Sequence, residues 1–154
     1  MRGREMDSRI LARKALYTLD EKHLPARDKG PVKKFVRHYT DSRLTLAEIF
    51  MPITFVSLIM TLAVPSTGDT AANVVAAFNL FFLLMMIALV LDISIFAIRL
   101  RGKLNKEFSK AETKGAIFYG ISRSLTLRTM RLPKPNVSIG GAPREIKLPK
   151  SLQD

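Results

Sequence analysis

The chain has 154 residues, of which 25 are Lys or Arg and 13 are Asp or Glu, so its formal net charge is +12. It contains no Cys, which excludes disulfide bonds, thiolate metal sites and a Cys nucleophile. Because 47% of the residues are apolar, a basic soluble domain and a small membrane protein both fit these totals, and the arrangement of the charges has to decide between them.

The first segment, residues 1–43, is basic and carries two predicted helices separated by a proline-rich turn. The first helix is expected over about Asp7–Leu19, where a ragged row of apolar residues falls on one side: Ile10, Leu11, Ala15, Leu16 and Leu19. The turn Leu24–Pro31 follows, because Pro25 and Pro31 disfavour a helical conformation at the residues before them. No long apolar run precedes the second helix, so we expect no signal peptide here.

The second helix of this segment is expected to begin at Pro31, whose missing N–H is tolerated in the first helical turn. Its apolar face follows the spacing i, i+3, i+4 and i+7, with Val32, Phe35, Val36 and Tyr39. The opposite side is basic, with Lys33, Lys34, Arg37 and His38. A basic amphipathic helix just before an apolar segment is expected to lie in the headgroup layer of a membrane. The alternative is an ordinary amphipathic helix packed on a soluble core.

The central segment, residues 44–98, contains no Lys or Arg. Two apolar stretches, Leu44–Val64 and Ala71–Ile98, are joined by the short stretch Pro65–Thr70. The first has one ionisable residue, Glu48, near its start, and the second contains a long uninterrupted apolar run. A soluble domain with this much basic charge would place some of it on every helix. The segment therefore predicts a two-helix transmembrane hairpin.

The last segment, residues 99–154, is again basic. Residues 99–114 are expected to continue the second span into water. Gly115–Met130 shows apolar residues at helical spacing, which predicts a second interfacial helix ended by the two prolines that follow it. The remainder, Asn136–Asp154, contains several Gly and Pro and is expected to be an extended tail without a core of its own.

The distribution of positive charge predicts the orientation. Residues 1–43 hold 12 Lys or Arg and residues 99–154 hold 13, whereas the connecting stretch has none. The positive-inside rule then places both termini in the cytoplasm, at the plasma membrane of a bacterium. The basic flanks fit anionic phospholipids or acidic protein surfaces better than nucleic acid, because few aromatic residues are placed for base stacking and no nucleic-acid motif is present.

Asp92 is the one carboxylate well inside a predicted span, and ionisable residues inside a membrane are energetically costly. Folding the hairpin about Thr67 and Gly68 brings Asp92 level with Arg43, so we interpret these two as an intramembrane ion pair. A proton relay or ion site at Asp92 is the alternative. Glu48 is interpreted as a helix-end residue that can pair with a neighbouring cation, rather than as half of a catalytic dyad.

The sequence predicts no catalytic, cofactor-binding or metal-binding set. The two histidines, His23 and His38, lie fifteen residues apart in a segment predicted to be solvated, which does not make a metal or haem site. Gly140-Gly141 lacks the flanking pattern of a phosphate-binding loop.

The block Leu24–Arg43 before the first span is distinctive. It contains Leu-Pro-x-Arg-Asp-x-Gly-Pro-Val, two basic residues, and Phe-Val-Arg-x-Tyr-x-Asp-Ser-Arg. The block resembles the signature of a family of uncharacterised actinobacterial two-span membrane proteins, and the resemblance covers most of the chain. The chain is also similar to a small accessory subunit of the actinobacterial cytochrome bcc–aa3 respiratory supercomplex. That resemblance implies an assembly role beside haem-bearing subunits, with no redox centre in this chain.

We therefore expect an all-α membrane protein that is not an enzyme and that acts as an accessory or assembly subunit. Its expected partners are larger membrane subunits, such as cytochrome b or oxidase subunits, and anionic phospholipids. The residues expected to contact a partner or lipid are Arg27, Asp28, Lys33, Lys34, Phe35, Arg37, Tyr39 and Arg43. Two alternatives stay open: a membrane-tethered scaffold or regulator that binds anionic lipids or cytoplasmic partners, and a small proton or ion transporter that uses Asp92.

Overall fold

The computed structural model describes residues 2–63, 69–110, 112–149 and 152. In this part of the chain the structure is all-helical, with five α-helices, one short 3₁₀ turn and no strand, which confirms the predicted all-α class. The helices in chain order are α1 (Arg2–Thr18), α2 (Pro31–Asp41), α3 (Leu46–Ala63), α4 (Asp69–Glu107) and α5 (Ala116–Leu125), and the 3₁₀ turn η1 covers Ala26–Asp28.

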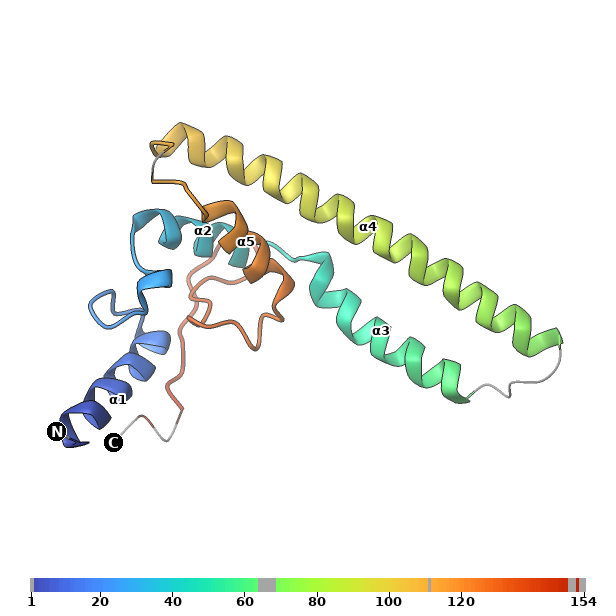
Figure 1. Ribbon diagram of the computed structural model, residues 1–154, viewed down its shortest axis with the longest axis horizontal. Helices are drawn as coiled ribbons and strands as arrows, with labels where there is room; N and C mark the ends of the chain where they lie inside the picture. The colour runs from blue at the N-terminus through green and yellow to red at the C-terminus, as the bar shows by residue number, and fades with distance from the viewer. Residues whose placement is uncertain (1, 64–68, 111, 150–151, 153–154) are drawn as a thin grey trace.

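Helices α3 and α4 extend away from the rest of the molecule (Figure 1). α3 runs outward, and α4 returns beside it and continues past the start of α3. The rings of Phe50 on α3 and Phe82 on α4 lie 5.6 Å apart, so the two helices are in contact. α4 extends to Glu107, as expected for a second apolar helix that continues beyond Ile98. The predicted connecting stretch falls mostly on residues 64–68, which lie outside the described residues.

Both helices are long and apolar enough to cross a membrane. Their large apolar side chains are exposed along most of their length, with Phe55 65%, Leu62 79% and Leu84 57% exposed. A core helix of a soluble protein buries these residue types, and soluble proteins rarely expose apolar patches of this extent. The surface of α3 and α4 therefore differs from that of a helix in a soluble core.

At the other end of the molecule, α2 and α5 pack on the last turns of α4, and α1 and residues 126–149 lie on the side of α2 and α5 away from α4; we call this part of the molecule the basal unit (Figure 1). Its core takes one apolar face from each of α2, α4 and α5, consisting of Val32, Val36, Phe96, Leu100, Leu104 and Ala116. The α4 residues recur every four positions, which places them on one side of that helix.

This packing corrects the expectation that α2 lies in the headgroup layer on its apolar face. Val32 and Val36 are buried in the core, and Phe35 and Tyr39 pack against it. The face is covered by protein, as in the alternative of an ordinary amphipathic helix on a core.

Helix α5 is shorter than the predicted helix over Gly115–Met130. It ends at Leu125, because Thr126 adopts an extended backbone conformation (φ −81°, ψ 133°). Ile117 and Ile121 pack against the core of the basal unit, whereas Phe118 and Leu125 are 76% and 45% exposed, so only part of the apolar side of this helix is covered by protein. The helix therefore ends well before the prolines that were expected to stop it.

The C-terminal segment is extended, as expected, but it packs on the basal unit. The backbone N–H of Lys134 donates to the carbonyl oxygen of Leu16 at 2.8 Å, and that of Gly140 donates to the carbonyl oxygen of Ser42 at 2.8 Å. Val137 is buried. These contacts tie the segment to α1 and to the residue after α2, so it packs on them instead of lying free.

We predict that Gly120→Ala destabilises the fold. A Cβ at this position of α5 would lie 2.8 Å from Leu100 Cδ2 and 3.0 Å from Val36 Cγ1, and both side chains are fully buried, so a shift of either would disturb the surrounding core. Overpacking of this kind lowers the free energy of unfolding by ~1–3 kcal/mol. Denaturant titration of the detergent-solubilised chain, followed by circular dichroism, measures the change.

Gly102→Ala is the matched control for this prediction. A Cβ at Gly102 meets no atom within 4 Å, and the residue lies inside α4. Since Ala is the better helix former, this variant is expected to be unchanged or slightly more stable. Equal loss of stability in the two variants would contradict the packing described for α5.

Candidate functional site

The basal unit holds a buried ion network centred on Asp41, the last residue of α2. Arg123 on α5 donates from Nη2 to Asp41 Oδ2 at 2.7 Å and also from Nε to the same carboxylate. Arg131, which follows α5, donates from Nη1 to Asp41 Oδ1 at 3.1 Å. The three side chains are 2%, 4% and 0% exposed, respectively. One carboxylate therefore neutralises part of two guanidinium charges inside the protein.

Glu48 in the first turn of α3 supplies the second carboxylate of the network. Arg131 Nη2 donates to Glu48 Oε1 at 2.6 Å. Thr45 Oγ1, directly before α3, lies 3.0 Å from the same carboxylate oxygen and 3.1 Å from the carbonyl oxygen of Ser124 on α5. A carboxylate in a first helical turn also interacts favourably with the free N–H groups there. The network thus fastens the start of α3 to α2 and α5.

Arg131 is the residue that joins both carboxylates. Burial lowers the pKa of its guanidinium, whereas Glu48 and Asp41 act in the opposite direction. A buried guanidinium is tolerated when carboxylates and hydrogen bonds surround it. The arrangement is therefore a structural clamp in which each charge has a partner.

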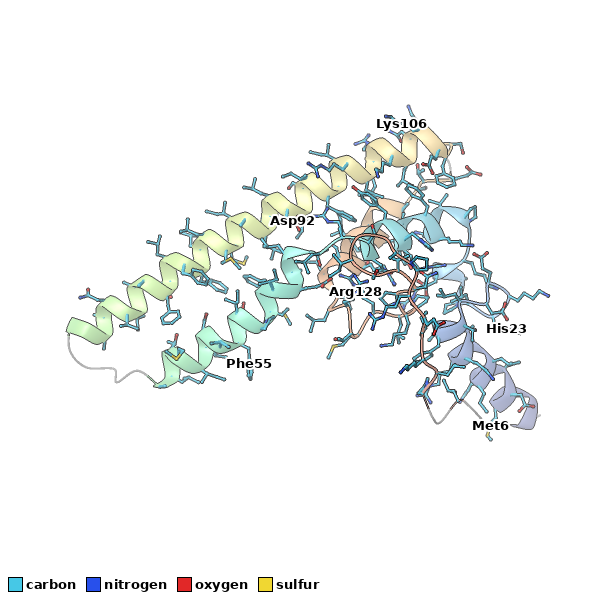
Figure 2. All side chains as sticks on the ribbon, turned by 180° about the vertical axis from the view of Figure 1, so that it is seen from behind. Met6, His23, Phe55, Asp92, Lys106 and Arg128 are labelled. Atoms are coloured by element: carbon cyan, nitrogen blue, oxygen red, sulfur yellow. The ribbon has the colours of Figure 1, made fainter. Side chains whose placement is uncertain are left out.

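A second ion pair joins α4 to the approach to α3. The Arg43 guanidinium donates to Asp92 Oδ1 and lies 5.0 Å from the centre of the Phe96 ring. Asp92 Oδ2 also accepts from the backbone N–H of Leu46 at 3.4 Å, so this carboxylate faces the N-terminus of α3. In Figure 2, Asp92 lies on α4 beside the start of α3. The two residues that the sequence argument paired do lie together in the structure.

Asp28 organises the side of the basal unit away from this pair. It is 1% exposed, and its Oδ1 accepts from the Tyr119 hydroxyl at 2.8 Å. The guanidinium of Arg37 donates to the backbone carbonyl oxygen of Asp28. Lys33 Nζ lies 4.6 Å from the centre of the Tyr119 ring. These contacts join η1 and the start of α2 to α5.

The structure divides the residues that were expected to contact a partner or lipid. Asp28 and Arg37 are buried inside the chain, so their role in the described fold is internal. Phe35, Lys33, Tyr39 and Arg43 are partly buried, and the Phe35 and Tyr39 rings stack on each other. Arg27 and Lys34 are exposed and are the most accessible of the set. The block therefore supplies buried residues to the basal unit, and a contact of its accessible residues with a partner or lipid stays a prediction.

The central residues of the network, Asp41, Arg123 and Arg131, were absent from the predicted site. Asp41 is 82 positions from Arg123 and 90 from Arg131, and no local pattern joins it to them. A local pattern does mark the part of the network at the start of α3. Thr45-Leu46-Ala47-Glu48 matches the capping-box pattern, in which the first and fourth residues lie together at the start of a helix.

The described residues offer no obvious place for a metal ion, since no three His, Asp or Glu side chains among them lie close enough together to hold one. One open groove on the surface of the basal unit has a volume of about 540 Å³ and is lined in part by Arg27, Lys33 and Phe118. The ion pairs of the network join α2, α3 and α5 to one another.

We predict that Asp41→Ala strongly destabilises the chain. It would leave Arg123 and Arg131 buried with one carboxylate fewer, and breaking a buried ion cluster lowers the free energy of unfolding by ~3–5 kcal/mol. Asp20→Asn, which removes a carboxylate from an exposed pair with His23, is the control and should unfold like the wild type. Chemical denaturation followed by circular dichroism measures both. Similar stability of the two variants would show that the network contributes little.

We predict a late tyrosine ionisation from Tyr119. Burial of its phenol, together with the hydrogen bond to Asp28, raises its pKa to about 12. Because a tyrosine in an unfolded chain ionises near ~10, deprotonation favours unfolding, and the free energy of unfolding should fall as pH rises from about 10 to about 12.

Ultraviolet titration of the wild type against Tyr119→Phe isolates this transition. The difference spectrum should be centred near pH 12 in the folded protein. A difference centred near ~10, the ordinary value for tyrosine, would contradict the buried position.

Comparison with known proteins places this architecture in a family. The model of the family described as "Protein of unknown function (DUF3043)" matches residues 1–141. Uncharacterised proteins of Mycobacterium tuberculosis and Mycobacterium bovis are each 28% identical over 131 residues, which cover 84% of this chain and 52% of the relative. An uncharacterised protein of Mycobacterium leprae is 28% identical over 136 residues, covering 84% of this chain and 55% of the relative.

The chain spans about half the length of the curated relatives it matches. No solved structure matches it. The relatives agree with the resemblance to an actinobacterial family that the block before the first apolar helix indicated. Since the family model covers most of the chain, from the basic N-terminal helix to the extended C-terminal segment, this protein belongs to the DUF3043 family of proteins of unknown function.

Proposed function

We propose that the chain is a non-catalytic accessory subunit that anchors in a bacterial plasma membrane through α3 and α4 and packs against a larger membrane assembly. The observation that carries the proposal is the separation of the two kinds of surface. Apolar side chains are exposed on α3 and the outer part of α4, whereas charged side chains are buried in the basal unit: Asp28, Arg37, Asp41, Arg123 and Arg131. A bilayer is the solvent in which such a pair of helices is stable.

The length of α3 and the charges that follow the apolar part of α4 support a spanning arrangement with the basal unit on the cytoplasmic side. α3 has 18 residues, and at ~1.5 Å per residue it rises about 27 Å, close to the ~30 Å of a hydrocarbon core. On α4 the apolar stretch is followed at once by exposed cations, Arg99, Arg101, Lys103 and Lys106. Such residues favour the cytoplasmic side. The basal unit and both ends of the chain then lie in the cytoplasm.

The partners of the ionisable residues support an anchoring role. Asp92, the carboxylate on which a proton relay would depend, is held by Arg43 and by the N-terminus of α3. Glu48 is held by Arg131. Each of these carboxylates joins helices to one another.

The identity of the larger assembly is proposed from the resemblance to an accessory subunit of the actinobacterial cytochrome bcc–aa3 supercomplex. Cytochrome b or oxidase subunits are the proposed protein partners. Anionic phospholipids are proposed to bind the exposed cations of α4, since each Lys or Arg near an anionic surface contributes ~1 kcal/mol. This row of cations also favours the second candidate function, a membrane-tethered scaffold that binds anionic lipid.

Purification from native membranes in a mild detergent, followed by mass spectrometry of the co-eluting proteins, tests the proposal. We expect haem-bearing subunits to co-elute with the tagged chain in constant ratio. Recovery of the chain with phospholipid but no protein would contradict the accessory role and favour the scaffold.

Asp92→Asn is the informative variant in the same experiment. It leaves Arg43 without its carboxylate, so we expect looser packing of α3 on α4 and a smaller amount of co-eluting partner. Asp20→Asn again serves as the control. A variant that assembled normally but lost a proton or ion flux would instead favour the transporter.

A further inference from the structure

Leu125, the last residue of α5, and the residues that follow it to Leu132 are together called the turn here, and they have an inverted distribution of charged and apolar side chains. Its two arginines are turned inward: Arg131 is buried in the ion network, and Arg128 donates to the backbone carbonyl oxygens of Asp41 and Val137. Its Leu125 and Met130 are 45% and 69% exposed. A turn that faces water normally exposes the charged side chains and covers the apolar ones.

This turn lies beside the start of α3. Thr45 Oγ1 is 3.1 Å from the carbonyl oxygen of Ser124, and Arg131 Nη2 is 2.6 Å from Glu48 Oε1. α5 runs in the same general direction as α3, so its C-terminal end points toward the apolar helices (Figure 1). Ser124, directly before the turn, and Arg131, near its end, are thus in contact with the start of α3.

The level of the proposed membrane follows from the lengths of the helices. α3 rises about 27 Å, slightly less than a hydrocarbon core of ~30 Å, so its first turn has to lie at the hydrocarbon boundary. Leu44, just before α3, is 49% exposed. On α4, Ile95 and Ile98 lie beyond Asp92 and are 46% and 71% exposed. The apolar surface therefore reaches at least as far as the start of α3, where the turn lies.

We propose that residues 125–132 form a third membrane contact, in which Leu125 and Met130 insert among the headgroups and upper acyl chains of the cytoplasmic leaflet. This inference rests on the proposed spanning arrangement of α3 and α4. The bilayer is the occupant because the apolar surface of the turn adjoins the apolar surface at the start of α3, and both face the same leaflet. Apolar side chains at the headgroup boundary stabilise binding in proportion to the area that they bury.

The test uses the absence of Cys from the chain, which allows a single environment-sensitive fluorophore to be attached at a chosen position. The variants are Leu125→Cys and Met130→Cys in the turn, Phe55→Cys in α3 as a span reference, and Met6→Cys in α1 as a matched control. Met6 is 61% exposed, like Met130, but lies at the opposite end of the molecule from α3 (Figure 2). The labelled full chain is reconstituted in vesicles of phosphatidylcholine and phosphatidylglycerol.

Two quenchers are used with each label. Iodide, added on both sides of the bilayer, measures exposure of the label to water, and a nitroxide attached near the headgroup end of a lipid acyl chain measures its contact with lipid. Labels at 125 and 130 are expected to show at least about threefold less iodide quenching than the label at position 6, and strong quenching by the nitroxide. Iodide quenching at 125 and 130 equal to that at position 6, with position 55 protected, would overturn the third contact and leave the spans intact. Free access of iodide to position 55 would overturn the spanning arrangement itself, and the inference with it.

Discussion

The carboxylate of Asp41 holds the architecture together, because two buried guanidinium groups depend on it. Arg123 and Arg131 come from α5 and from the segment after it, and Asp41 ends α2. Neither arginine would be tolerated in this interior without a counter-charge, since an unpaired buried ion is far more costly than a paired one. Through Arg131 the same interaction reaches Glu48, so the position of α3 depends on it as well.

The class of fold and the extent of the apolar helices were predictable because their signals are local. The absence of Lys and Arg from residues 44–98 marks both apolar helices, and the structure places them at Leu46–Ala63 and Asp69–Glu107. The pairing of Arg43 with Asp92 followed from the geometry of a hairpin alone. The extent of each apolar helix can be read from adjacent residues. The level of Arg43 relative to Asp92 follows from the rise per residue of two helices joined by a short connection.

The partner of the apolar face of α2 and the members of the ion network could not be predicted from neighbouring residues in the sequence. A 3.6-residue period shows that Val32 and Val36 share a face, but it does not distinguish a membrane surface from another helix as the partner of that face. The face is covered by α4 and α5, whose core residues Leu100 and Ala116 are 64 and 80 positions away from Val36. The network likewise joins residues brought together only by the tertiary fold. Basic residues such as Arg131, which look like solvated charges in the sequence, are part of the interior.

Helix α4 has one further consequence for the whole molecule. Its 39 residues form a single helix of roughly 58 Å at ~1.5 Å per residue, with no proline and no break between the outer end and the basal unit. The basal unit is built directly on its last turns through Phe96, Leu100 and Leu104. Within the described residues, α4 therefore joins the outer end of the apolar helices to the basal unit directly, without a flexible tether. In the proposed orientation, a change in the tilt of α4 turns the basal unit by the same angle. Because the tilt of a spanning helix depends on the thickness of the bilayer, the orientation of the basal unit at the cytoplasmic surface depends on that thickness too.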